Sequence, residues 1–188
     1  MPSKTGNSFE GWTKSDGGSW DESTSTYTFD SSDGTLTAGW LANSYILTTV
    51  ASPLDAGTVT AGGTLDYDST KTLTATPENI TGYTTAFLNW TLSGPGSLTS
   101  TTTNPTTFKT GAGDATVTAT FTKTANTYTV KFNGNGANSG SMANQSFVYD
   151  EAAKPLSANQ FIKNNYNFIG WNTKADGTGV SYEPEQSV

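Results

Sequence analysis

Apolar and polar residues alternate along several short stretches of the chain, and this is the pattern of β-strands that bury one face. In residues 116–121, the side chains of Val117, Ala119 and Phe121 fall on one face and three threonines fall on the other. Residues 35–40 repeat this pattern. Clusters of Gly, Asn, Asp and Pro separate such stretches, so the sequence predicts a mainly β fold of short strands joined by tight turns.

One stretch departs from the alternation. Ser157 precedes a segment in which Phe161 and Ile162 are adjacent apolar residues. A serine before such a segment is typical of the N-terminal cap of a helix. We therefore expect a short helix over residues 157–164, lying across a small sheet in the last part of the chain.

The same short motifs recur at nearly equal intervals along the chain. Phe9-Glu10-Gly11-Trp12 returns as Phe87-Leu88-Asn89-Trp90 and as Phe168-Ile169-Gly170-Trp171. The strand pattern that ends at Trp40 returns, after the same interval, in the one that ends at Phe121. Ala42-Asn43-Ser44-Tyr45 returns as Ala125-Asn126-Thr127-Tyr128. Three independent markers that share one period indicate tandem modules.

The phase of these motifs places boundaries near residues 43 and 126. Residues 1–43 are then the C-terminal part of one module, residues 44–126 form a complete divergent module, and residues 127–188 form a module without its last strand. Both ends of the sequence cut through a module in this division, so we expect a segment of a longer protein.

The composition excludes several kinds of catalytic and metal-binding site. The 188 residues include 33% hydrophobic and 13% charged residues, with no cysteine and no histidine, and all nine basic residues are lysines. Without those side chains there is no disulfide, thiolate nucleophile, imidazole base or histidine-ligated metal. The net charge of −7 disfavours nucleic acid as a partner, and no apolar run approaches the roughly 18 residues that membrane insertion needs. We expect no enzyme activity and no cofactor.

The recurring aromatic residues are expected to be structural. A large ring at one position of each repeat suits the core of a module that has little other apolar area, because its burial contributes about 1.5–3 kcal/mol. The expected structural anchors are Phe9, Trp12, Trp40, Phe87, Trp90, Phe121, Phe168 and Trp171. Trp20 lies outside the repeat pattern, so we expect it to be the exposed ring most suited to contact a ligand, such as a stacked sugar.

Paired acidic residues are the other candidate site. Asp66 and Asp68 have the spacing with which a turn presents two oxygen ligands to calcium, and two similar pairs occur elsewhere. None matches the twelve-residue calcium loop with its closing Glu. We therefore interpret these residues as solvated loop acids and expect no metal site.

The motifs resemble a known family. The segment from Tyr128-Thr129-Val130-Lys131-Phe132 to Phe168-Ile169-Gly170-Trp171 strongly resembles the Listeria–Bacteroides repeat, the internalin B-repeat type of module. The segment 1–43 resembles the second half of that repeat. The middle of the chain, through Leu73-Thr74-Ala75-Thr76-Pro77 and Gly82-Tyr83, resembles the divergent version of the repeat. The resemblance implies small β-grasp-like modules with mostly antiparallel sheets, arranged in tandem in large bacterial surface or secreted proteins that are often adhesin-like.

Three functions follow from these observations. The first is a non-catalytic spacer or stalk segment of a bacterial cell-surface or secreted protein, with the neighbouring modules of the parent chain as its partners. The second is a binding module that recognises a host glycan or protein through exposed aromatic rings such as Trp20. The third is a self-assembling filament or virion subunit, whose incomplete modules are completed head to tail by strand exchange between chains.

Overall fold

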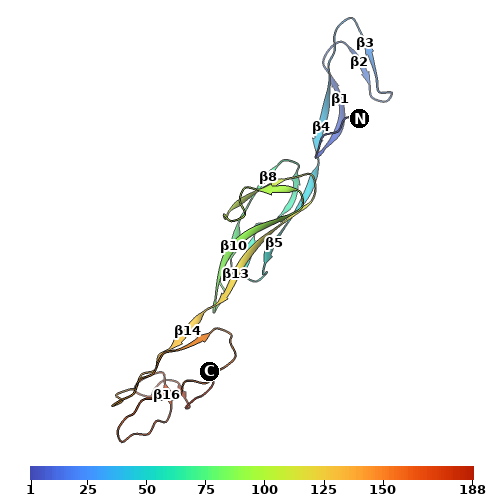
Figure 1. Cartoon of the computed structure of the whole chain (residues 1–188). Helices are drawn as coiled ribbons and strands as arrows, with labels where there is room; N and C mark the ends of the chain where they lie inside the picture. Colours follow the sequence, from blue (N-terminus) through green and yellow to red (C-terminus); the bar gives the residue numbers. More distant parts are fainter. The chain divides into compact units, whose positions relative to one another are not determined.

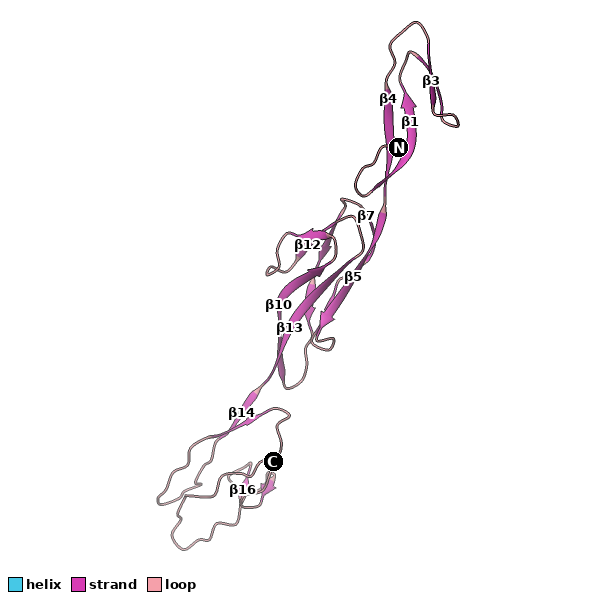
Figure 2. Cartoon of the chain, turned by 45° about the vertical axis from the view of Figure 1, so that its right-hand side comes forward, coloured by secondary structure: helices cyan, strands magenta, loops and turns pink.

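The computed structural model describes residues 1–188 as an all-β protein with seventeen strands in seven small sheets (Figure 1). By contact the chain divides into two compact units. The first unit comprises residues 1–79 and 85–123, and the second comprises residues 80–84 and 124–188. Figure 2 shows strands and loops only, and no helix in the structure is long and apolar enough to cross a lipid bilayer.

A four-stranded sheet contributes the largest part of the first unit, with the strand order β10-β13-β5-β7. Strand β13 pairs with β5 in parallel, and β5 pairs with β7 in the antiparallel direction. The strands are β5 (Ser44–Ser52), β7 (Gly63–Asp66), β10 (Tyr83–Ser93) and β13 (Ala115–Ala125). The parallel pair means that the sheets are mostly, but not entirely, antiparallel.

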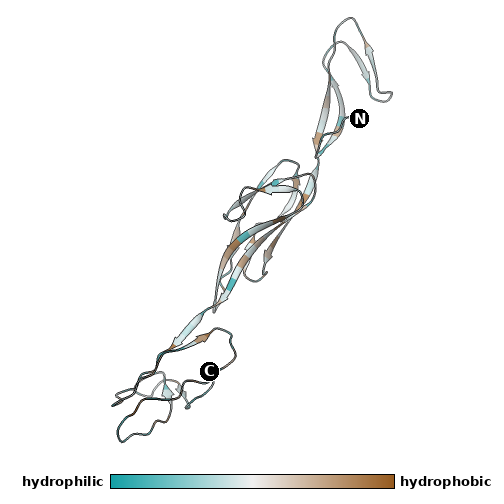
Figure 3. Cartoon of the chain, viewed as in Figure 1, coloured by the Kyte–Doolittle hydropathy of each residue, from teal (hydrophilic) through white to brown (hydrophobic).

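The hydrophobic core of the first unit lies against this sheet. Val117 and Ala119 of β13 are fully buried and Phe121 is 4% exposed, so the face predicted from the alternation of residues 116–121 is the buried one. Apolar positions are scattered along these strands between polar ones (Figure 3). The other buried members of the core cluster are Leu47, Ala56, Leu73, Ala75, Trp90, Phe108 and Ala115.

Smaller sheets complete the first unit. One is three-stranded, in the order β11-β12-β8, and the others are pairs of antiparallel strands. The members of the three-stranded sheet are β8 (Thr70–Leu73), β11 (Gly96–Leu98) and β12 (Thr106–Thr110). The pairs are β1 (Asn7–Lys14) with β4 (Leu36–Ala42), β2 (Gly18–Asp21) with β3 (Thr26–Phe29), and β6 (Gly57–Val59) with β9 (Ala75–Pro77).

The Gly-Trp motif marks an irregularity in strand β1. The pairing of β1 with β4 shifts by one residue between Phe9 and Gly11, and Gly11 has a φ of 127°, which L-residues with a side chain rarely adopt. Asn89 occupies the matching position in β10 and has no positive φ. Where asparagine replaces glycine, the backbone therefore no longer has the positive φ found at Gly11.

The second unit has less regular structure. Its strands are β14 (Thr127–Val130), β15 (Gln145–Val148), β16 (Trp171–Asn172) and β17 (Ser181–Tyr182), and they form two antiparallel pairs. Leu156 is its one buried apolar residue, at 5% exposed. Its aromatic rings form a cluster, in which the rings of Phe132, Phe168 and Phe161 lie 4.6, 4.8 and 6.3 Å from the ring of Trp171.

The short helix expected over residues 157–164 is absent. Ser157 does not cap a helix, because both its backbone N–H and its hydroxyl donate to the side-chain oxygen of Gln145. The amide side chain of Asn159 bonds to the N–H and to the carbonyl of Phe161, which competes with helical hydrogen bonding. Ile162 forms a β-bridge with Ser139 instead. The helix that a β-grasp arrangement would contain is therefore not supported.

The burial of β13 leads to a first prediction. Phe121→Ala should lower the free energy of unfolding of the first unit by about 3–5 kcal/mol, because it removes a buried ring and leaves a cavity. Phe29→Ala is the matched control, since the Phe29 side chain is 78% exposed, and it should change stability by less than about 0.5 kcal/mol. Urea unfolding followed by circular dichroism measures both, and equal effects would contradict the assigned core.

Candidate functional site

The structure places the recurring aromatic residues of β1 and β4 in one cluster. The ring of Phe9 lies 5.3 Å from that of Trp12 and 5.6 Å from that of Trp40, both edge to face. All three side chains are half-buried. Edge-to-face pairs of this kind add about 0.5–1.5 kcal/mol beyond their buried area, so the cluster holds the two strands together.

The corresponding residues of β10 and β13 are more deeply buried. Trp90 is 1% exposed, and its indole N–H donates to the carbonyl of Thr103 at 3.0 Å. Phe87 lies 5.2 Å from Trp90 and 6.3 Å from Phe121. In the second unit, Trp171 is half-buried and Phe168 is 39% exposed. The recurring aromatic positions are thus packed to different extents.

Trp20 lies beside the first of these clusters. Its ring is 6.4 Å from that of Trp12, edge to face, and the side chain is half-buried. Its indole nitrogen is buried and has no hydrogen-bond partner. Trp20 therefore packs against the aromatic cluster of β1 and β4, although it lies outside the repeated sequence motif. Contact with a ligand through this ring stays a prediction.

Three members of the acidic pairs, Asp30, Asp66 and Asp68, have a local partner. Asp68 forms an ion pair with Lys109 at 2.7 Å, which raises the pKa of the lysine, and Asp66 accepts a hydrogen bond from the hydroxyl of Ser44. Asp30 accepts from the backbone and hydroxyl of Ser32, which lowers the pKa of its carboxyl group. No three acidic side chains converge.

A set of three residues connects distant segments of the first unit, and we call it the first Gly–Asn–Tyr junction: Gly6, Asn43 and Tyr67. The N–H of Asn43 donates to the carbonyl of Gly6 at 2.9 Å, and the N–H of Tyr67 donates to the carbonyl of Asn43 at 2.8 Å. The hydroxyl of Ser8 donates to the side-chain oxygen of Asn43 at 2.6 Å. The Tyr67 ring covers Gly6, where an added Cβ would overlap it.

The same arrangement recurs within the second unit, where Gly82, Asn126 and Tyr149 form the second Gly–Asn–Tyr junction. The backbone N–H of Asn126 donates to the carbonyl of Gly82, and the backbone N–H of Tyr149 donates to the carbonyl of Asn126, both at 2.8 Å. The hydroxyl of Thr84 takes the place of Ser8 and donates to the Asn126 side chain at 2.7 Å. The Tyr149 ring covers Gly82. Two such matching sets make the junction a repeated device of this chain.

The tyrosine of each junction projects from the same kind of turn. Asp68 and Asp150 follow the two tyrosines and have φ values of 65° and 62°, in the left-handed region that Asp tolerates better than most residues. In the second junction, Tyr149 also packs edge to face on Tyr83 at 5.3 Å, and the hydroxyl of Tyr83 donates to Asp150. The turn thereby fixes the tyrosine over the glycine.

Sequence reasoning identified only part of this site. Asn43 and Asn126 were repeat markers because the residues beside them also match, but the two tyrosines carried no expectation. Tyr67 and Tyr149 are separated by one repeat period, and each directly precedes an aspartate. The repeat period itself therefore contained the missing signal.

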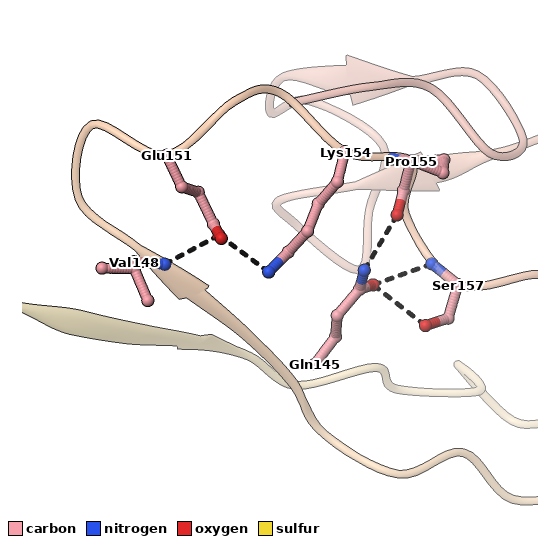
Figure 4. Close-up of polar contacts among 6 residues, drawn as sticks. All are labelled: Gln145, Val148, Glu151, Lys154, Pro155 and Ser157. Carbon is pink, nitrogen blue, oxygen red and sulfur yellow. Dashed lines mark hydrogen bonds and ion pairs between the residues drawn. The ribbon is translucent and has the colours of Figure 1, made fainter.

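Glu151 holds the turn of the second junction in place (Figure 4). Its carboxylate accepts the backbone N–H of Val148 and forms an ion pair with Lys154, both at 2.7 Å. The hydrogen bond from Lys154, followed by the one from Val148, lowers the pKa of the Glu151 carboxyl group. Nearby, the Gln145 side chain bonds to the carbonyl of Pro155 and to Ser157, which ties β15 to the segment that follows the turn.

Comparison with known protein families identifies repeat domains along the chain. The divergent InlB B-repeat domain matches residues 3–44 and 47–125, and the Listeria–Bacteroides repeat domain matches residues 128–188. This chain belongs to the B-repeat family. The B-repeats of this kind are typical of bacterial surface proteins, and each Gly–Asn–Tyr junction takes residues from two successive matched segments.

Two relatives of these B-repeats come from Evansella cellulosilytica. One, provisionally named a membrane protein, is 33% identical over 97% of this chain, which spans 26% of that relative. The other, provisionally named a Gly-rich membrane protein, is 36% identical over 41% of this chain and is covered to 9% of its length. The chain thus spans about a quarter or less of these relatives. No solved structure matches the chain.

The second junction leads to a matched pair of substitutions. Gly82 and Gly177 have φ values of 79° and 78°, but a Cβ at Gly82 overlaps the Tyr149 ring whereas one at Gly177 meets nothing. Both substitutions to Ala share a backbone cost of about 1–2 kcal/mol. We expect only Gly82→Ala to accelerate amide hydrogen exchange at Asn126 and Tyr149, by at least about tenfold, since about 1.4 kcal/mol corresponds to that factor. Equal exchange in the two variants would contradict a packing role for the junction.

The ion pair of Glu151 leads to a prediction about pH. Because the pKa of Glu151 is lowered in the folded chain, its stabilisation is present above the ordinary glutamate pKa and is lost as the pH falls through the folded value. Lys154→Met should raise the pKa of Glu151 toward its ordinary value in an NMR titration. Asp176, whose pKa is lowered by hydrogen bonds from Thr178, should keep its low pKa in this variant. An unchanged Glu151 pKa would rule out the assigned cause.

Proposed function

We propose that this chain is a non-catalytic spacer segment of a bacterial surface protein, in which B-repeats in tandem carry other parts of the parent protein away from the cell. The modules comprise residues 1–43, 44–126 and 127–188. The observation that carries the proposal is the repeated Gly–Asn–Tyr junction, because it joins one matched segment to the next by the same contacts.

The surface chemistry supports a structural role outside the cell. Threonine-rich strand faces, a net charge of −7 and the absence of cysteine suit a chain exposed to an oxidising surrounding, where a free thiol is a liability. The names of the two relatives point the same way, as both are called membrane proteins. The acidic side chains described above are engaged in local turns and ion pairs, which is the role of structural residues rather than of a catalytic pair.

A display experiment tests the spacer function. We would place the chain, or two copies in tandem, between a cell-wall anchor and an epitope, and measure the height of the epitope above the membrane by fluorescence. A stepwise increase in height with copy number is the expected result. A Gly/Ser chain of equal length is the control and should extend less, because a flexible coil spans a distance that grows only with the square root of its length. A height equal to that of the control would overturn the proposal.

A binding function through aromatic rings is the second candidate. The observation that favours it is the edge-to-face pair of Trp12 and Trp20, because both side chains are only half-buried and leave part of their surface accessible. Saturable binding to a glycan or host protein that Trp20→Ala abolishes, with the fold unchanged, would establish it over the spacer function. Light scattering of the purified chain across a hundredfold range of concentration tests the third candidate, since a self-assembling subunit would gain mass in whole-chain steps.

A further inference from the structure

An aromatic groove is open in the second unit. It encloses about 1010 Å³ and is lined by residues of that unit alone, among them Phe132, Phe161 and Trp171. Two of its other lining residues are largely exposed, Tyr166 at 70% and Ile169 at 86%. An exposed apolar surface of this kind is typical of a site where another segment or molecule binds.

In the first unit, a β-strand lies where this groove is open. Strand β1, which carries Phe9 and Trp12, is paired along its length with β4. Strand β10, which carries Phe87 and Trp90, is hydrogen-bonded to β13. The matching residues 166–170 belong to no strand, and β16 pairs only with β17. The aromatic segments of β1 and β10 are thus paired with β4 and β13, which we call the closing strands. The third aromatic segment, residues 166–170, has no closing strand.

The polar groups at the groove show the same difference. The indole N–H of Trp90 has an acceptor, whereas the buried indole nitrogen of Trp171 has none. Each of the three aromatic segments also begins with one kind of turn, in which Gly6, Gly82 and Asn165 have φ values of 67°, 79° and 63°. The carbonyl groups of Gly6 and Gly82 accept the N–H of an asparagine, but that of Asn165 accepts none.

We propose that this groove binds one added β-strand, the closing strand of a further B-repeat. The strand carries apolar residues at alternate positions, ends with a large aromatic residue and is followed closely by an asparagine, as in Val117-Ala119-Phe121 and Asn126. It runs antiparallel to residues 166–171, as β4 does to β1. The backbone N–H of its asparagine donates to the carbonyl of Asn165, and this bond fixes the register of the added strand against residues 166–171.

Closing strands already present in the chain do not suit this role. Strands β4 and β13 are paired with β1 and β10, so a second copy of the chain would have to break one of those pairs to donate a strand. The occupant is therefore a closing strand that has no other partner. No tyrosine ring is expected to cover Asn165, because its Cβ occupies the space that Gly6 and Gly82 leave for the rings of Tyr67 and Tyr149.

The test adds the strand to the full chain. A copy of residues 113–126 is joined after Val188 through a Gly/Ser linker, whose length places the copied strand as far beyond Trp171 as Thr116 lies beyond Trp90. The matched control carries asparagine at the positions copied from Val117, Ala119 and Phe121. This control keeps the length and the linker but removes the apolar face.

Amide hydrogen exchange at Phe168 and Gly170 is the readout, together with the NMR signal of the Trp171 indole N–H. The proposal expects exchange to slow at least about tenfold with the copied strand and to stay unchanged with the control. Equal exchange rates in the two extended chains would overturn it. A dimer of the unextended chain with these amides protected would also overturn it, because the occupant would then be a second copy.

Discussion

The structure depends on the pairing of a closing strand with an aromatic strand that lies far from it along the chain. Backbone hydrogen bonds satisfy the edge of the aromatic strand, and alternate side chains of the closing strand cover its rings. In the first unit, the buried positions Val117, Ala119 and Phe121 make this contact with the layer that contains Phe87 and Trp90. Without such a strand, the same motif in the second unit leaves Phe168 partly exposed and the Trp171 nitrogen unpaired. The closing strand thus decides how much of each repeat becomes a packed core.

The Gly–Asn–Tyr junctions extend this dependence from one repeat to the next. The asparagine follows directly on the closing strand, its N–H reaches back to the glycine at the start of the aromatic strand, and its carbonyl receives the tyrosine N–H. Completion of one repeat and attachment of the following segment therefore share a residue. A chain built in this way gains length by repetition, which is the property that a spacer requires.

The sequence anticipated those features that local patterns determine. Period-two alternation identified the buried face of residues 116–121. The recurrence of the Phe-x-x-Trp motif indicated tandem repeats, and the family matches confirm them. The expected helix failed because Gln145 and the side chain of Asn159 supply competing hydrogen bonds, which no helical pattern reveals. The junctions escaped notice because each joins three segments far apart in the chain. Trp20, which sequence reasoning set apart, packs on Trp12 through the β2–β3 hairpin.

Native-state amide hydrogen exchange of the unmodified chain is the most direct test of the central role of the closing strand. It compares three equivalent segments under one condition: residues 8–11, 84–89 and 167–170. The account predicts slow exchange in the first two segments and exchange at least about a hundredfold faster in the third, because only the first two are paired with a closing strand. Comparable protection of all three segments would contradict it.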